Sequence, residues 1–252
     1  MLMAAAAAAG LIAALVGFLA ILLSSTTLEE VRERGSITVL TQNTQHAYYL
    51  LRGEPAGFEY ELAREFADSL GVELLVQTRP WSELIPALTA GDGDFIAASL
   101  TSTEERRVRV AFSDPYLIVR QQLIVHASRR GVRDLADVNG MTVHVRAGTS
   151  YENRVRELIA GGLQAELVVH RDRPTEDLIR AVAQEEIEAT VADTHVAQLN
   201  RRYYPDVRIA LALSGPQPLA WAVRPGDRAL RAEIDSFFEK IKDDGTFDRI
   251  YE

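Results

Sequence analysis

The stretch that decides the fold is residues 57–77, GFEYELAREFADSLGVELLVQ. Its large apolar side chains recur every four residues and form one face of a helix; they are Phe58, Leu62, Phe66 and Leu70. Gly71 follows at the position where a glycine most often ends a helix. Residues 72–77 form the next apolar run. The stretch therefore predicts a helix that leads into a strand, which is half of an α/β unit.

The same alternation continues on both sides of this stretch. Strands are predicted at residues 36–41, 72–77 and 95–99, and again at 142–145, 166–170 and 189–193. Helices fall between these strands, and a last amphipathic helix is predicted at residues 228–242. Two β-α-β-α-β runs predict an α/β fold with two mostly parallel sheets that carry helices on their faces.

Two extended apolar segments, residues 120–125 and 217–223, connect the two runs. A chain that enters a second lobe on one strand and returns on another makes a two-strand hinge. We therefore expect lobe 1 at residues 28–119 and 216–252, and lobe 2 at residues 120–215. A ligand is expected in the cleft between them, at the carboxyl ends of the parallel strands.

The N-terminal segment differs from the rest of the chain. Residues 1–27 carry no charge, and residues 2–23 are apolar or small throughout. A helix of this length would cross the hydrocarbon core of a membrane. The segment predicts a membrane anchor or a signal peptide, and its length favours an anchor that is retained. The remainder is then expected to be periplasmic or otherwise extracytoplasmic.

Composition excludes several classes of function. The chain has 252 residues, a net charge of −9 and no cysteine. An acidic chain is a poor partner for nucleic acid. Without cysteine there is no disulfide, no thiolate metal site, no cysteine nucleophile and no lipidated N-terminal cysteine. The five histidines lack the spacing of a zinc site, and no Ser-hydrolase or nucleotide-binding motif occurs. We therefore predict no metal, no cofactor and no catalytic residue.

One motif predicts an anion site. Residues 101–106, TSTEER, follow the strand predicted at 95–99, and FSDPY follows at residues 112–116. The planar guanidinium of Arg106 suits a carboxylate, which it can bind with two hydrogen bonds. The alternative is that Arg106 joins Arg107 and Arg109 on a solvated surface.

The long string T-x-T-x-E-R-x(5)-F-S-x-P-Y resembles the periplasmic solute-binding proteins that serve polar amino-acid transporters. The resemblance covers residues 28–252 and is closer still to the regulatory N-terminal module of membrane-bound lytic transglycosylases F. The other shared strings lie at residues 57–63, 121–124, 192–193, 219–222 and 244–246. This resemblance implies a type II periplasmic-binding-protein fold.

The resemblance also implies roles for individual residues. Arg106 matches the arginine that grips the carboxylate of the ligand, with Ser99 and Thr101 as its neighbours. Trp81 falls where the family places an aromatic side chain against the ligand. Asp193 matches the acid that pairs with the ligand ammonium. The alternative for Asp193 is an N-cap of the helix that begins at residue 194.

In the predicted second lobe, the resemblance implies that a turn at a helix start binds the same carboxylate. The turn contains Arg146, Thr149 and Ser150. Such a helix start suits an anion because its backbone N–H groups are free. The chain departs from the family after its first strand, where Gln42 and Tyr48 are the candidate ligand-binding residues. The expected ligand is therefore an amino acid or another molecule with an α-carboxylate, such as a cell-wall peptide.

Three functions remain open at this point. The first is a ligand-binding protein, either the receptor of an ABC transporter or a tethered sensor. The second is the regulatory part of a lytic transglycosylase whose catalytic domain lies outside this chain. The third is a dehydratase on the same scaffold, with Glu104 or Glu105 as its acid. The implied partners are a transporter permease or peptidoglycan, and the membrane through residues 2–23.

Overall fold

The computed structural model describes residues 28–252. The predicted anchor at residues 2–23 lies outside the described residues. Within residues 28–252, no helix combines the length and the apolar character that a membrane crossing needs. The helices are α2 (Leu28–Arg34), α3 (Phe58–Leu70), α4 (Leu84–Ala90), α5 (Glu104–Arg107), α6 (Ser150–Ala160), α7 (Thr175–Ala183), α8 (Thr194–Tyr203), α9 (Arg228–Asp243) and α10 (Thr246–Tyr251), with short 3-10 helices η1 (Trp81–Glu83) and η2 (Ala136–Val138).

The first sheet has the strand order β4-β1-β5-β14-β6. Its strands are β1 (Ser36–Thr41), β4 (Glu73–Thr78), β5 (Phe95–Ile96), β6 (Ala111–Phe112) and β14 (Ala222–Val223). Strand β1 runs parallel to β4 and β5, and β14 runs antiparallel to β5 and β6. The hairpin of β2 (Tyr49–Leu51) and β3 (Glu54–Ala56) extends from the loop after β1.

The second sheet has the strand order β10-β9-β11-β8-β12. Its strands are β8 (Gln121–His126), β9 (Thr142–Arg146), β10 (Glu166–His170), β11 (Ala189–Asp193) and β12 (Val207–Ala212). Strands β9, β10 and β11 are parallel, whereas β8 is antiparallel to β11 and β12.

Both sheets are thus mixed, and mostly parallel as expected: β14 in the first sheet and β8 in the second run against the other four strands. The cause is the path of the chain. Gln121 begins β8 opposite Asp193, which ends β11. The chain therefore enters this sheet at the edge where the parallel strands end, so β8 must run away from that edge. Residues 120–125, expected as a hinge strand, accordingly lie almost wholly within β8.

The chain crosses between the sheets on a two-stranded ribbon. Strand β7 (Leu117–Val119) pairs antiparallel with β13 (Gln217–Leu219). The expected return segment, residues 217–223, is divided between this ribbon and β14 of the first sheet. The ribbon contains the two passages of the chain between the sheets.

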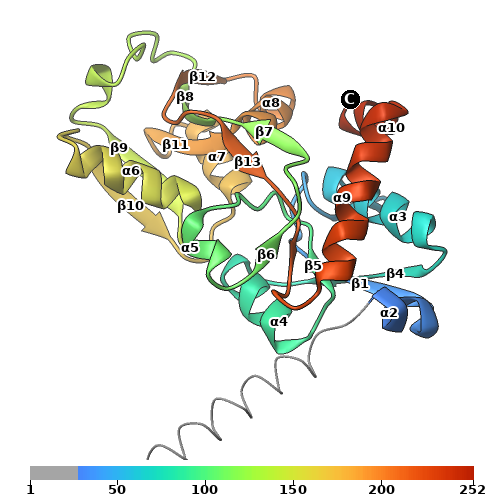
Figure 1. Cartoon of the computed structure of the whole chain (residues 1–252). Coiled ribbons are helices and arrows are strands. Elements are labelled where there is room, and N and C mark those ends of the chain that lie inside the picture. Colours follow the sequence, from blue (N-terminus) through green and yellow to red (C-terminus); the bar gives the residue numbers. More distant parts are fainter. Residues whose placement is uncertain (1–27) are drawn as a thin grey trace, which may run out of the picture.

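Each sheet is buried on both faces because its central side chains alternate between two cores. In the first sheet, Val39 and Phe95 pack on the side of α3 and α9, while Leu40 and Ile96 pack on the side of α4. Figure 1 shows α9 running beside α3. The second sheet packs one face against α6 and the other against α7 and α8. Each sheet therefore has cores of its own.

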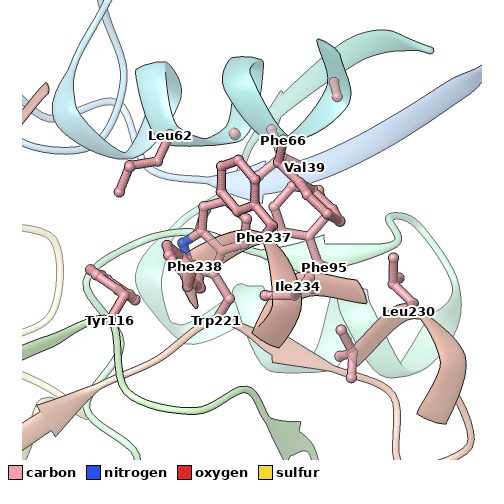
Figure 2. Close-up of a cluster of buried hydrophobic side chains, with 14 of the residues drawn as sticks. Val39, Leu62, Phe66, Phe95, Tyr116, Trp221, Leu230, Ile234, Phe237 and Phe238 are labelled. Carbon is pink, nitrogen blue, oxygen red and sulfur yellow. The ribbon is translucent and has the colours of Figure 1, made fainter. Parts of the chain in front are cut away.

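An aromatic cluster fills the core between α3, α9 and the first sheet. Trp221 lies among Phe66, Phe95, Phe237 and Phe238 (Figure 2). Its ring centroid is 4.9 Å from that of Phe95 and 4.7 Å from that of Phe238. Aromatic pairs at such distances add to the free energy of burial. The cluster fixes β14 and α9 against the N-terminal part of the chain.

Candidate ligand-binding site

A small cavity lies where the two sheets face each other. Its volume is about 30 Å³, roughly the space of one water molecule. The side chains around it come from both sheets and their helices: Gln42, His46, Trp81, Ala98, Ser99, Thr101, Arg146, Thr149, Ser150, Tyr151, Thr175, Glu176, Asp193 and Val196. Gln42, Arg146 and Asp193 stand at the carboxyl ends of β1, β9 and β11. This is the edge at which α/β sheets bind ligands.

Arg106 lies at the border of this cavity. Thr103 caps α5 by accepting from the backbone N–H of Arg106, and the Arg106 side chain turns inward, where it is buried. The guanidinium donates to the carbonyls of Thr101 (2.9 Å) and Gly148 (3.1 Å). Burial lowers the pKa of Arg106 to about 10. No carboxylate of residues 28–252 hydrogen-bonds it, so the site holds a buried cation that suits an anion.

The turn at residues 146–150 meets Arg106 from the second sheet. Thr149 accepts from the N–H of Glu152 at the start of α6 and donates to the carbonyl of Arg146 (2.7 Å). Ser150 Oγ lies 3.1 Å from Thr101 Oγ1. Trp81 donates its ring N–H to the carbonyl of Gly148 (2.9 Å). Side chains on both sides therefore close the cleft by direct hydrogen bonds.

Asp193 is a buried carboxylate with a free oxygen. Its Oδ2 accepts from the hydroxyl of Tyr151 (2.9 Å), whereas Oδ1 is buried and has no hydrogen-bond partner within residues 28–252. Asp193 does occupy the N-cap position of α8, but its side chain makes no capping hydrogen bond there. Burial raises the pKa of Asp193 to about 7, although Tyr151 opposes the shift. The free oxygen suits a cationic donor.

Glu59 supports the loop that carries Ser99. Ser99 has a φ of 49°, which is an uncommon conformation for a residue other than glycine. Its backbone N–H and its hydroxyl both donate to Glu59 Oε1, at 2.5 and 2.9 Å. Tyr116 donates to the same oxygen, and Trp221 donates its ring N–H to Oε2. The sequence does contain a signal for Glu59, since helical spacing places it on the buried face with Leu62 and Ala63.

His46 and Glu176 join the two sides of the cleft. His46 Nδ1 lies 2.5 Å from Glu176 Oε1, which belongs to the first turn of α7. Burial alone would lower the pKa of His46, but the charge and hydrogen bond of Glu176 outweigh it and raise that pKa. Burial opposes the shift at Glu176 too, yet His46 keeps the pKa of that carboxyl lowered. The pair is an ion pair in a mostly buried setting.

His195 lies next to this pair. Its Nε2 is 3.1 Å from Ser99 Oγ, and its ring meets that of His46 edge to face. Burial lowers the pKa of His195 to about 3, with His46 adding to the effect. His195 is therefore neutral and offers hydrogen bonds without charge. No motif in the sequence singles out His46, His195, Tyr151 or Glu176.

The structure brings most of the predicted site residues together. Eight of the ten line the cavity: Gln42, Trp81, Ser99, Thr101, Arg146, Thr149, Ser150 and Asp193. Arg106 borders it through Trp81, whose ring centroid lies 5.1 Å from the guanidinium carbon. Tyr48 does not line it, because the loop after β1 folds back at Thr44 and turns the Tyr48 ring onto Tyr60. His46 faces the cavity from that loop instead.

Residues 37–252 match the family model of the bacterial extracellular solute-binding proteins, family 3. The chain belongs to this family. Membership supports extracytoplasmic binding of a small ligand. Among the solved structures it resembles is an ancestral amino-acid-binding protein that is a precursor of cyclohexadienyl dehydratase, with a TM-score of 0.81 and 28% identity over 89% of this chain and 97% of that one. An ancestral arginine-binding protein bound to arginine gives 0.78 and 29%, over 86% and 97%. These likenesses confirm the type II periplasmic-binding-protein fold, here with mixed sheets.

The curated relatives are longer proteins. A membrane-bound lytic murein transglycosylase F of Desulfosudis oleivorans is 52% identical over 228 residues, which are 90% of this chain and 50% of the relative. One of Pseudomonas fluorescens is 35% identical over 228 residues, which are 89% of this chain and 47% of the relative. The family-3 chain thus spans about half the length of the curated relatives it matches. The resemblance to transglycosylases F is confirmed for this half.

Proposed function

We propose that this family-3 protein binds a small α-amino acid, or a closely related molecule, between two lobes that close around it. The observation that carries the proposal is a pair of opposite buried charges at one cavity. Arg106 has no carboxylate partner among the described residues, and Asp193 has a free buried oxygen. A zwitterion supplies both missing partners. Solved neighbours with 29% and 31% identity are described as bound to arginine and glutamine, which are ligands of this class.

The two lobes would be residues 28–119 with 216–252, and residues 120–215. The ribbon of β7 and β13 would serve as the hinge, because it contains both passages of the chain between the sheets. Contacts across the cleft, such as Thr101 with Ser150 and His46 with Glu176, would form as the lobes close. A ligand favours the closed state only by as much as it binds that state better.

The protein would act outside the cytoplasm, tethered by residues 2–23, as a receptor or as a sensor. Two partners follow from the alternatives. If the protein is a receptor, its partner would be a transporter permease. If it is a sensor, its partner would be peptidoglycan or peptidoglycan fragments. The 52% identity to half of a membrane-bound transglycosylase F favours the sensor, as a regulatory module of that kind of enzyme.

A thermal-shift screen of the full chain in detergent tests this function. Amino acids and muropeptides are added one at a time. A ligand at about one hundred times its Kd stabilises the native state by about 2.7 kcal/mol, which raises the Tm of a protein of this size by roughly 5–10 °C. The shift should vanish in Arg106→Ala and Asp193→Asn and persist in the control Arg156→Ala, whose side chain is exposed.

Two results would contradict the proposal. One is the absence of any shift across the screen. The other is a ligand whose shift survives both cleft substitutions. The same sample, incubated with prephenate or arogenate, tests the dehydratase alternative, because product formation would show that the site is catalytic and does more than bind.

A further inference from the structure

A second chamber continues from the cavity past the side chains of Gln42 and Arg146, which line both spaces. Its volume is about 280 Å³, far more than the central cavity offers. Two prolines and six polar side chains form its wall; the polar ones are Gln42, Asn43, Thr44, Thr78, Arg79 and Arg146. A ligand in the central cavity whose side chain extends past Gln42 and Arg146 would therefore meet polar surroundings.

The charge of this chamber is one-sided. Two arginines line it, and none of the acidic side chains that the structure describes does. Arg146 donates one Nη to Gln42 Oε1, while its Nε is buried without a hydrogen-bond partner. Glu176 attracts Arg146, but the hydrogen bond of Glu176 goes to His46. The positive charge of Arg146 is therefore only partly compensated.

Arg79 adds to this charge. Its Nη2 donates to the neutral Gln77 (2.8 Å) and lies 3.8 Å from Asp92, a half-exposed carboxylate. An ion pair of this kind at the surface contributes little. Both arginines thus have donors left for an anion in the chamber.

Trp81 links the two anion sites. The guanidinium carbon of Arg106 lies 5.1 Å from the ring centroid, and that of Arg146 lies 5.8 Å from it. A small molecule lying along this ring can reach both. Resting on the function proposed above, we propose that the ligand carries a second carboxylate on its side chain, which Arg146 binds in the chamber. The ligand class is then an acidic α-amino acid.

A ligand with a neutral or a cationic side chain would fit the chamber less well than one with an acidic side chain. A neutral amide would give the guanidinium of Arg146 a weaker acceptor than a carboxylate does. A lysine or arginine side chain would bring a third positive charge beside Arg79 and Arg146, and like charges at short range repel. The expected order of affinity is glutamate, then glutamine, then lysine and arginine.

Isothermal titration of the full chain in detergent tests this order. Glutamate and glutamine have the same shape, so their difference isolates the charge. Both enantiomers are titrated, because contacts at Arg106, Asp193 and Arg146 would fix three groups of the ligand and so favour one enantiomer. The Kd of glutamate should be at least about tenfold lower, as expected for one charge-assisted pair. Arg146→Met should weaken glutamate at least about tenfold and glutamine less than about threefold. Arg79→Met should also weaken glutamate more than glutamine, but by a smaller factor than Arg146→Met does. The exposed control Arg156→Met should leave the Kd of both amino acids unchanged.

The outcomes separate the two proposals. If glutamine binds as tightly as glutamate, or if Arg146→Met weakens both equally, the acidic ligand is refuted and the binding function stands. If no amino acid binds, both proposals fail. The comparison of glutamate with glutamine on the unmodified chain needs no variant, so a failure of Arg146→Met to fold would leave the test decisive.

Discussion

The carboxylate of Glu59 offers a sharp test of how the cleft is supported. Glu59 is 1% exposed and lies in the first turn of α3. It accepts hydrogen bonds from the N–H and the hydroxyl of Ser99, from Tyr116 and from Trp221. All four partners are donors, and the first three share Oε1. We predict that Glu59→Gln destabilises the protein strongly although the side chain keeps its shape.

The magnitude follows from counting donors. An amide has one oxygen, which can still accept from Ser99 and Tyr116 if it occupies the place of Oε1. Its NH2 group then faces the ring N–H of Trp221, so two donors meet and both stay unpaired. One buried unpaired group costs about 1–3 kcal/mol, and the other bonds lose their charge assistance. We expect a loss of about 3–5 kcal/mol, which lowers the Tm of a protein of this size by roughly 10 °C.

Urea denaturation of the wild type and the variant measures this loss directly. Glu61→Gln is the matched control, because Glu61 is the other acid in the first turn of α3. The control removes the same charge from the same helix end without breaking the buried network. Should Glu59→Gln lose less than about 1 kcal/mol, or no more than Glu61→Gln, the account of Glu59 as the support of Ser99 is wrong.

Three further predictions concern the cleft itself. The pKa of His46 is raised and that of Glu176 is lowered, so their ion pair stabilises the folded state fully between about pH 4.5 and about pH 6.5, and this contribution fades as the pH rises through the raised pKa. Glu176→Gln should therefore lower the free energy of unfolding, measured by urea titration, more at about pH 6 than at about pH 9, and an equal loss at both would contradict the pairing. Burial raises the pKa of Asp193 to about 7, so amino-acid binding should be at least about tenfold weaker at about pH 5.5 than at about pH 8, whereas Asp193→Asn should bind weakly at both. A Kd that calorimetry finds to be the same at the two pH values would rule out a contact between Asp193 and the ligand ammonium. Trp81 lines the cavity while Trp221 is buried in the core, so ligand should change the fluorescence of the wild type but not of Trp81→Phe, and a full change in that variant would place the ligand elsewhere.

The sequence predicts the elements that local periodicity controls. The helix expected after Gly57 is α3, and Gly71 ends it with a φ of 70°, a left-handed conformation. The helix expected at residues 228–242 is α9, with the expected side chains buried. Local pattern fails where the site distorts the backbone. The strand expected at residues 95–99 ends at Ile96, since Ser99 must adopt its unusual φ to reach Glu59.

The residues of the candidate site also fall into two groups, those that could be predicted from the sequence and those that could not. Thr101, Arg146 and Asp193, which stand at strand ends or in a continuous motif, are predicted from the family resemblance, and the structure places all three around the cavity. His46 and Glu176 could not be predicted, since 130 residues separate them and neither belongs to a motif. Their pairing follows from how the parts of the chain around the two sheets meet, and periodicity within one segment holds no information on that contact.

The charges of the cleft explain why a zwitterion should bind better than either of its halves. A simple carboxylate would neutralise Arg106 and leave Asp193 buried with its free oxygen, so the pKa of Asp193 would stay raised. A simple amine would pair with Asp193 and leave the cation of Arg106 without an anion. Only a molecule with both groups satisfies Arg106 and Asp193 at once, and the second group would bind at the high effective concentration that the first creates. In the function proposed above, ligand selection and lobe closure would therefore be the same electrostatic event.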